Sequence, residues 1–152
     1  MRIIEFTATG HENIRAMHNT TLEFTKHSKL SLQGDCIIAV NADFDPKQVR
    51  ELAQNYDKIK IKLKAGLATD SIDAITNKKF ESEDEIVIRV GEFESIRTLG
   101  IRASKSASQL NRKLIEKLKK PTQSIKITIE GYDAVTQKQN QQKANALLLA
   151  QN

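Results

Sequence analysis

Alternation of apolar and polar residues is the strongest constraint that this sequence places on its fold. The segment KIKIKLK, residues 58–64, alternates without a break, and three further segments follow the same period. This period places successive side chains on opposite faces of a strand, so each segment is expected to bury one face. The apolar positions of the four strands are Leu22 and Phe24, Ile59, Ile61 and Leu63, Ile86, Ile88 and Val90, and Ile125, Ile127 and Ile129.

Two segments between these strands carry the period and the end signals of helices. In the first, Asp45 is suited to cap the helix and Pro46 to occupy its first position. In the second, Ser106 and Gln109 fit a capping box, and Pro121 marks the end of the helix. This mixture of strands and helices predicts an α+β fold.

The order of these segments repeats along the chain. DCIIAVNAD (residues 35–43) can be laid over IRTLGIRAS (residues 96–104), and the flanking segments agree in the same order. We therefore predict an internal duplication, with copies at residues 1–65 and 66–132, each in the order strand, strand, strand, helix, strand. Both copies are expected to share one domain of residues 1–132.

A sheet built from two such copies has too few helices to cover both of its faces. Closing the sheet on itself would bury the inner face and remove the exposed edges. We therefore predict a pseudo-twofold closed or nearly closed β-barrel with two helices. The alternative is an open antiparallel sheet with both helices on one face.

Residues 133–152 have no counterpart in the first copy. Their glutamines and asparagines are typical of a flexible linker, but the alanines and leucines near the end would support a short helix. A short helix is marginal in water on its own, so an ordered one would pack on the barrel or on a second subunit. A homo-oligomer through this tail or through a barrel edge is therefore one expected partner.

Location and cofactors follow from what the sequence contains. Cys36 is the only cysteine and cannot form an internal disulfide, which favours the cytoplasm. No apolar run is long enough to span a membrane, so no membrane partner is expected. Because the Walker and dinucleotide-binding motifs are missing, nucleotide hydrolysis and Rossmann chemistry are disfavoured, and the sequence assigns no cofactor.

Histidines, an aspartate and the cysteine form the first candidate site. His11 and His18 lie near the start of the chain, and Asp35 and Cys36 follow Gly34 in a turn. If these segments meet, Cys36 would supply a thiolate, a histidine would act as base or ligand, and Asp35 would orient it. A metal would be held by His11, His18 and Cys36. The alternative is structural, with a buried cysteine and an aspartate that accepts hydrogen bonds from turn amides.

Basic residues form the second candidate site, a nucleic-acid-binding surface. Four lysines project from one face of one strand, a fifth takes the matching place in the second copy, and the second helix adds one arginine and two lysines. These residues are Lys58, Lys60, Lys62, Lys64, Lys126, Arg112, Lys113 and Lys117. They could contact RNA phosphates, whereas base stacking has little support because aromatic residues make up only 5%. The alternative is a surface that favours solubility and protects a strand edge.

A smaller basic cluster lies just ahead of the second helix. Arg97, Arg102 and Lys105, with hydroxyls nearby, could bind a phosphate or a carboxylate. The alternative is that these side chains form ion pairs with carboxylates of the chain such as Glu92.

Three segments of the chain resemble a known family. GHENIRAMHNTTLEFTK, LQGDCIIAVNAD and IRTLGIRASKSASQLNRKLIEKLK resemble the archaeal proteins of domain of unknown function 371, most specifically in the block GDCII. The resemblance covers residues 10–131. It implies a small archaeal cytoplasmic protein and brings no assigned activity. The positions that match the family pattern are Gly10, His11, His18, Thr21, Glu23, Gly34, Asp35, Cys36, Arg97 and Arg102.

Three functions are therefore predicted. The first is a non-enzymatic module of archaeal information processing that binds RNA or a ribonucleoprotein through the lysines. The second is a small enzyme or metal-binding protein built on His11, His18, Asp35 and Cys36. The third is a protein-assembly module that uses the tail or the sheet edges.

Overall fold

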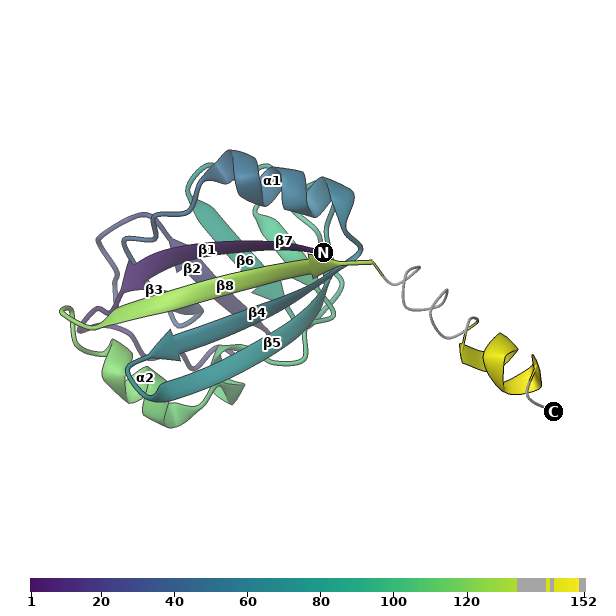
Figure 1. Cartoon of the computed structure of the whole chain (residues 1–152). Coiled ribbons are helices and arrows are strands. Elements are labelled where there is room, and N and C mark those ends of the chain that lie inside the picture. Colours follow the sequence, from purple (N-terminus) through teal and green to yellow (C-terminus); the bar gives the residue numbers. More distant parts are fainter. Residues whose placement is uncertain (134–141, 143, 151–152) are drawn as a thin grey trace.

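The computed structural model describes residues 1–133, 142 and 144–150. Residues 1–133 form an α+β fold around one large mixed sheet (Figure 1). The strands are β1 (Arg2–Thr9), β2 (Thr21–Thr25), β3 (Ile37–Ala39), β4 (Lys58–Ala65), β5 (Ala68–Thr76), β6 (Glu85–Arg89), β7 (Thr98–Ile101) and β8 (Ser124–Tyr132). The helices are α1 (Pro46–Asn55), the short 3-10 helix η1 (Ala107–Gln109) and α2 (Arg112–Leu118).

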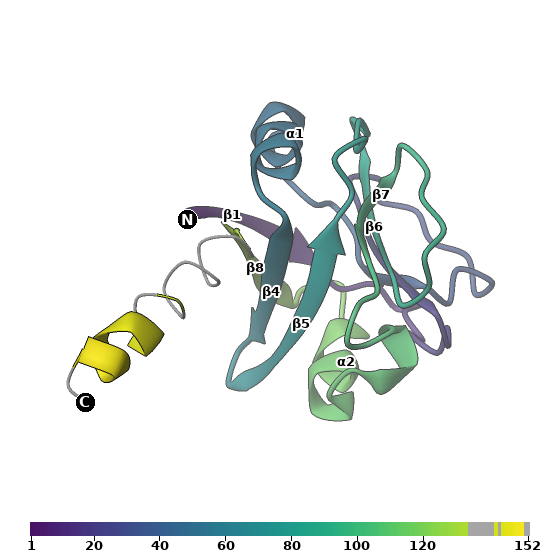
Figure 2. The same cartoon turned by 90° about the vertical axis from the view of Figure 1, so that its right-hand side faces the viewer.

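The strands follow the order β1-β8-β4-β5-β7-β6-β2-β3 in the sheet. Most neighbours are antiparallel, but β2 pairs with β3, and β6 with β7, in parallel, which makes the sheet mixed. The sheet curls, so that β1, β8, β4 and β5 lie in front of the other four strands in Figure 1 and to one side of β6 and β7 in Figure 2.

The predicted closed or nearly closed barrel is wrong. β1 and β3 are the two ends of the sheet, and the only β-bridge that joins these ends in the described residues is the isolated one between Thr9 and Val40. β3 spans three residues, and the positive φ of 54° at Asn41 turns the chain directly after the bridge. A ladder of paired residues therefore does not form between the ends. The alternative of a purely antiparallel sheet fails because the sheet is mixed.

The structure also does not show the predicted duplication. Strands of residues 1–65 and 66–132 are intermixed in one sheet, with β1 beside β8, β4 beside β5 and β2 beside β6, so neither half stands as a unit. The helices differ as well, because α1 has ten residues, whereas α2 has seven and follows the separate helix η1.

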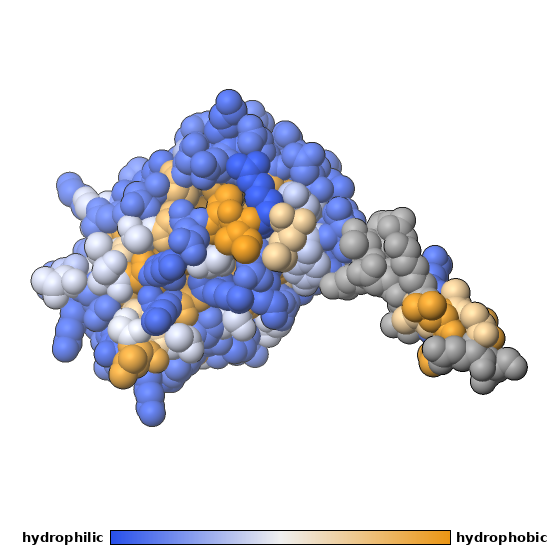
Figure 3. All heavy atoms as spheres, in the orientation of Figure 1, coloured by the Kyte–Doolittle hydropathy of each residue, from blue (hydrophilic) through white to orange (hydrophobic). Residues whose placement is uncertain are grey.

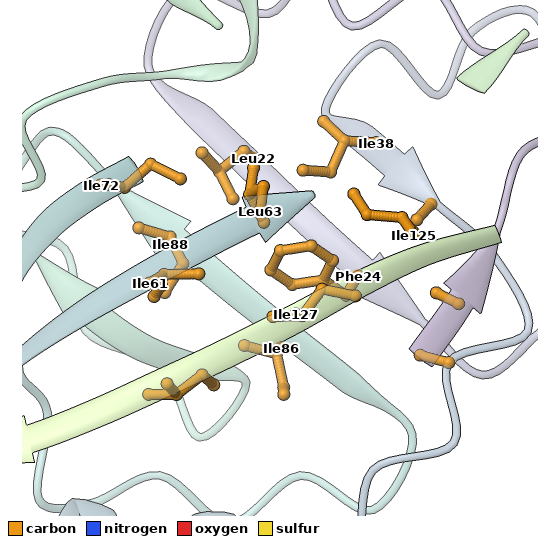
Figure 4. Packing of buried hydrophobic residues seen from close by; sticks show 14 of the residues in the cluster. Leu22, Phe24, Ile38, Ile61, Leu63, Ile72, Ile86, Ile88, Ile125 and Ile127 are labelled. Atoms are coloured by element: carbon orange, nitrogen blue, oxygen red, sulfur yellow. The ribbon is translucent and has the colours of Figure 1, made fainter. Parts of the chain in front are cut away.

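The core lies inside the curl of the sheet, where side chains from opposite strands point toward one another (Figure 4). The rings of Phe6 on β1 and Phe24 on β2, for example, meet edge to face with centroids 5.8 Å apart. The predicted alternation is confirmed, because every apolar position named from it is buried except Val90, which follows β6 and is 37% exposed.

The helices begin where the sequence signals indicated. The side chain of Asp45 caps α1, and Pro46 follows as its first residue. The capping box of Ser106 and Gln109 is present, but it caps the start of η1, and Asn111 then caps α2. None of the helices formed by the described residues is long and apolar enough to cross a membrane. Because α1 and α2 lie over opposite ends of the curl, the outer faces of the sheet are free of helices (Figures 1 and 2).

Much of the predicted tail falls outside the described residues. Residues 144–150 are helical and exposed, and their three leucines, Leu147, Leu148 and Leu149, are 62–75% exposed. Docking of this tail and an oligomer formed through it stay predictions.

Candidate functional site

Glu23 is an unusual side chain on the outer face of the sheet. Leu22 and Phe24 of β2 point into the core, yet Thr21, Glu23 and Thr25 on the opposite face are buried as well. The side chain of Glu23 is only 8% exposed. A carboxyl group is rarely buried unless it is paired, so its surroundings decide what it can do.

Four residues from the neighbouring strands and their flanks surround Glu23. Cys36, just before β3, accepts a hydrogen bond of 2.8 Å from the Glu23 N–H at its backbone carbonyl. Arg97, just before β7, places its guanidinium 3.7 Å from the Glu23 carboxylate and 2.7 Å from that of Glu85. Arg89 of β6 donates from Nε to a buried threonine hydroxyl of β7. We call Glu23, Cys36, Glu85, Arg89 and Arg97 the acid–arginine cluster.

The surroundings of Glu23 in this cluster favour the protonated, uncharged form of its carboxyl group. Burial, followed by repulsion from Glu85, raises the pKa of Glu23 from 4.5 to about 7, although Arg97 and Arg89 act in the opposite direction. Arg97 compensates Glu23 only in part because its shorter contact is to Glu85. The carboxyl group therefore changes charge near neutral pH, a property that is enriched at functional sites.

Cys36 is half-buried in the same cluster. Burial, followed by the nearby Glu23 carboxylate, raises the pKa of the Cys36 thiol. Because the thiolate is the nucleophilic and metal-binding form, these surroundings do not favour the predicted reactive role of Cys36, which stays a prediction.

A histidine and two carboxylates lie at one end of the cluster. Nε2 of His27, two residues after β2, lies 2.9 Å from Oδ2 of Asp84, and Glu85 starts β6 beside them. One ligand atom from each of these side chains lies within 4.8 Å of the others. In the part of the chain that the structure describes, this is the one group of three such side chains close enough to hold a metal ion.

The predicted reactive set is brought together only in part. The backbone N–H of His18 donates to the carbonyl of Asp35 at 3.3 Å, so those two segments meet. In both His11 and His18, however, Nδ1 accepts from the backbone N–H two residues later, at 3.0 and 3.2 Å. Oδ1 of Asp35 is buried without a hydrogen-bond partner in the described structure. Neither histidine belongs with Cys36 to a metal-binding group among the described residues.

The predicted anion cluster is divided between different partners. Arg97 and Arg102 flank opposite ends of β7. Arg97 pairs with acids of the cluster above, Arg102 donates from Nε to Glu92 at 2.7 Å, and Lys105 pairs with the buried carboxylate of Asp70. Each cation therefore has a carboxylate partner within the chain.

Lysines cover the outer face of β4, as the alternation indicated. Lys58, Lys60, Lys62 and Lys64 alternate with buried residues, and the register places Lys126 of β8 directly opposite Lys64. We call these five residues the lysine face. The face turns toward the viewer in Figure 3, where hydrophilic and apolar side chains are intermixed.

Carboxylates partner three lysines of this face. Lys60 lies 3.4 Å from Asp73 and Lys62 lies 2.7 Å from Glu130. Lys126 lies 3.3 Å from Glu5. Among the described residues, Lys58 and Lys64 form no ion pair, so the two ends of the β4 row keep uncompensated charge.

The guanidinium of Arg112 is engaged in hydrogen bonds within the protein. It donates to the carbonyl of Ala16 at 3.1 and 3.2 Å and to that of Ala107 at 2.6 Å. Ala16 has a positive φ of 52°, so the arginine fastens a constrained turn of the loop before β2 to η1. The other two basic residues of α2 differ, because Lys113 is exposed and Lys117 lies against Gly66 in the turn between β4 and β5.

Arg112→Lys should lower the free energy of unfolding by about 2 kcal/mol, because one ammonium cannot replace a planar fork that reaches two carbonyls. Urea unfolding followed by circular dichroism measures this difference. The reverse exchange at the neighbouring exposed position, Lys113→Arg, is the control and should change stability by less than about 0.5 kcal/mol. Equal stability of the two variants would contradict the structural role of Arg112.

Comparison with known proteins identifies the chain's relatives. The family described as "Domain of unknown function (DUF371)" matches residues 6–132. The chain belongs to this family. The uncharacterized protein MJ0206 of Methanocaldococcus jannaschii is 35% identical over 124 residues, which cover 78% of this chain and 92% of that protein. The family predicted from the three sequence segments is thereby confirmed.

Five of the ten positions that match the DUF371 pattern fall into two structural groups. Gly10 and His11 hold the segment before β8 and the end of α2, because their N–H groups donate to the carbonyls of Gln123 and Leu118, respectively, each at 2.9 Å. Glu23, Cys36 and Arg97 instead meet in the acid–arginine cluster. The first group has a structural role through these hydrogen bonds. The second group contains the buried carboxyl group of Glu23, which is costly to place on an outer face of the sheet.

Sequence reasoning did not single out His27, Asp84, Glu85 or Arg89 as members of a site around Glu23. Alternation in β6 does place Glu85 and Arg89 on one face, opposite the inward isoleucines. The missing information was the pairing of β6 with β2, which sets Glu85 opposite Thr25 and Arg89 opposite Thr21.

Proposed function

We propose that this DUF371 protein is a non-enzymatic RNA-binding module that contacts the phosphate backbone at the α2 end of the lysine face. The observation that carries the proposal is the cross-strand pair of Lys64 and Lys126. Like charges directly opposite each other destabilise a sheet, and a phosphate between them would offset this repulsion. A hollow of about 570 Å³ adjoins the pair, and Thr69, Ser71 and Thr128 contribute hydroxyl groups to its wall.

The pattern of ion pairs favours the α2 end of the lysine face, rather than its middle, as the place where a phosphate binds. Lys60 and Lys62 are compensated by carboxylates of the neighbouring strands. Lys126 and its partner Glu5 are 55% and 54% exposed, so water and salt screen that pair strongly. Lys117 adds a further positive charge at the turn that joins β4 to β5.

The composition of the chain supports contact with phosphates over recognition of bases. Only 5% of the residues are aromatic, and none lines the hollow. Stacking platforms for unpaired bases need aromatic side chains, whereas a phosphate contact needs only a positioned cation. A ribonucleoprotein as the partner and a cytoplasmic location belong to the same proposal.

Reversal of two charges tests the proposal. Lys64→Glu combined with Lys126→Glu should weaken the binding of a fluorescently labelled single-stranded RNA, because two phosphate contacts become repulsive. For the wild type, the logarithm of the binding constant should fall with the logarithm of salt concentration. The slope in the variant should be smaller by about 0.7 for each lysine that contacts a phosphate. Fluorescence anisotropy at several salt concentrations measures both quantities.

Lys29→Glu combined with Lys79→Glu is the matched control, because it makes the same charge change at two exposed lysines, one in the loop between β2 and β3 and one in the loop between β5 and β6. It should leave the salt slope unchanged. Wild-type protein that fails to bind RNA at low salt, or a double variant with the affinity of the control, would overturn the proposal.

A further inference from the structure

The end of the β2–β6 ladder gathers three metal-ligating side chains from two distant parts of the sequence. Strand pairing continues there beyond β2, because the N–H of Lys26 donates to the carbonyl of Asp84 at 2.9 Å. This contact sets His27 beside Asp84 and Glu85, with one ligand atom of each within 4.8 Å of the others. The side chains of His27 and Asp84 are 61% and 50% exposed, so an ion can reach them from solvent.

A second observation on the same face points to a missing positive charge. The side chain of Glu23 is only 8% exposed, and its ion-pair partner is the guanidinium of Arg97 at the long distance of 3.7 Å. Arg97 is drawn to Glu85 by the shorter contact of 2.7 Å, and Nε of Arg89 is bonded to Thr98. One guanidinium thus serves two carboxylates, and a mostly buried carboxylate that is compensated only in part is costly.

We propose that His27, Asp84 and Glu85 bind a divalent transition-metal ion, with zinc as the representative of this class. One imidazole nitrogen and two carboxylate oxygens are a donor set that zinc accepts, and three protein ligands leave a position for water or for a ligand group. The ion takes the place of the direct contact between His27 and Asp84. Purely hard ions such as magnesium are disfavoured by the imidazole.

Binding at this position also supplies the charge that the face lacks. When Glu85 ligates the ion, Arg97 loses its shorter partner and can turn fully to Glu23, which lies on the same face of β2. The metal site and the buried carboxyl group are thereby linked through one arginine. The site is separate from the lysine face, so its test does not depend on RNA binding.

Calorimetric titration of the full chain with zinc tests the proposal. The wild type should bind one ion per chain, and His27→Gln should weaken binding by about 100-fold or more, since even loss of an outer-shell partner costs 10- to 100-fold. Asp84→Asn should act in the same direction. His18→Gln is the matched control, because it removes an exposed imidazole that lies outside the group, and it should bind as the wild type does.

Cys36→Ser separates the proposed site from simple capture of zinc by the thiol. This variant should keep the wild-type affinity, because Cys36 is not a member of the group. Loss of binding in Cys36→Ser, equal affinity of His27→Gln and His18→Gln, or no binding by the wild type would each overturn the proposal. Circular dichroism of each variant confirms that the fold is intact, since the exchanged side chains of His27 and Asp84 are exposed.

Discussion

Glu23→Gln should make the protein more stable than the wild type by about 3 kcal/mol above pH 7, while the two proteins should be equally stable below pH 4.5. Glutamine keeps the size of the side chain and mimics the protonated carboxyl group. The expected gain arises because the wild type must ionise a buried group that Arg97 compensates only in part.

The direction follows from proton binding in the two states. Between pH 4.5 and about 7 the folded protein holds the proton on Glu23, whereas the unfolded chain has released it. Because the folded state then binds more protons, the stability of the wild type falls as pH rises through this window. Glutamine does not titrate, so the variant loses this component of the pH dependence. Urea unfolding at several pH values, followed by circular dichroism, gives both curves.

Glu5→Gln provides the control for this experiment. Glu5 forms an ion pair with Lys126 in which its side chain is 54% exposed, so the same exchange there should change stability by less than about 0.5 kcal/mol. If Glu23→Gln were instead less stable than the wild type above pH 7, Arg97 would fully compensate an ionised Glu23. An NMR titration of the Glu23 carboxyl carbon would decide the same question directly.

A buried glutamate that weakens the fold above neutral pH calls for a reason other than stability. Stabilising exchanges that cost nothing in function are readily found in proteins, whereas strained or destabilising groups are concentrated at functional sites. Glu23 therefore makes the outer face of β2 and β6 a candidate functional surface.

Local signals predicted the elements of this fold, but not how they assemble. Alternation identified the inward residues of β2, β4, β6 and β8, and Asp45 and Ser106 marked the starts of helical segments correctly. Closure of the sheet depended on whether β3 could pair along β1. That pairing was decided by the short length of β3 and by the turn at Asn41, which no periodicity reveals.

The candidate site illustrates the same limit at the level of side chains. Alternation predicted that β2 buries one face, yet Glu23 on the opposite face is buried as well, with Arg97 beside it. The contact between His27 and Asp84 joins positions 57 residues apart in sequence. Contacts of this range follow from strand pairing, and the sequence carried no signal that β2 and β6 are neighbours.

Gly10→Ala should lower the free energy of unfolding by about 3 kcal/mol, because the added methyl group has no room. A Cβ atom on Gly10 would overlap the backbone carbonyl oxygens of Leu118 and Lys120 at the end of α2. Backbone atoms cannot move aside as the tip of a side chain can. The chain would therefore have to lose the hydrogen bonds by which Gly10 and His11 hold the segment before β8 and the end of α2.

Gly91→Ala is the matched control, because no atom lies within 4 Å of a Cβ built at that glycine. It should be neutral or stabilise the protein by up to about 1 kcal/mol, since alanine restricts the unfolded chain. His11→Ala should also be mild, because the hydrogen bond from His11 to Leu118 uses the backbone N–H that alanine retains. A large loss in Gly10→Ala with a small loss in His11→Ala would assign this pair to holding α2, and would leave the acid–arginine cluster as the part of the family pattern that packing does not explain. Wild-type stability in Gly10→Ala would contradict the close approach of β1 to α2.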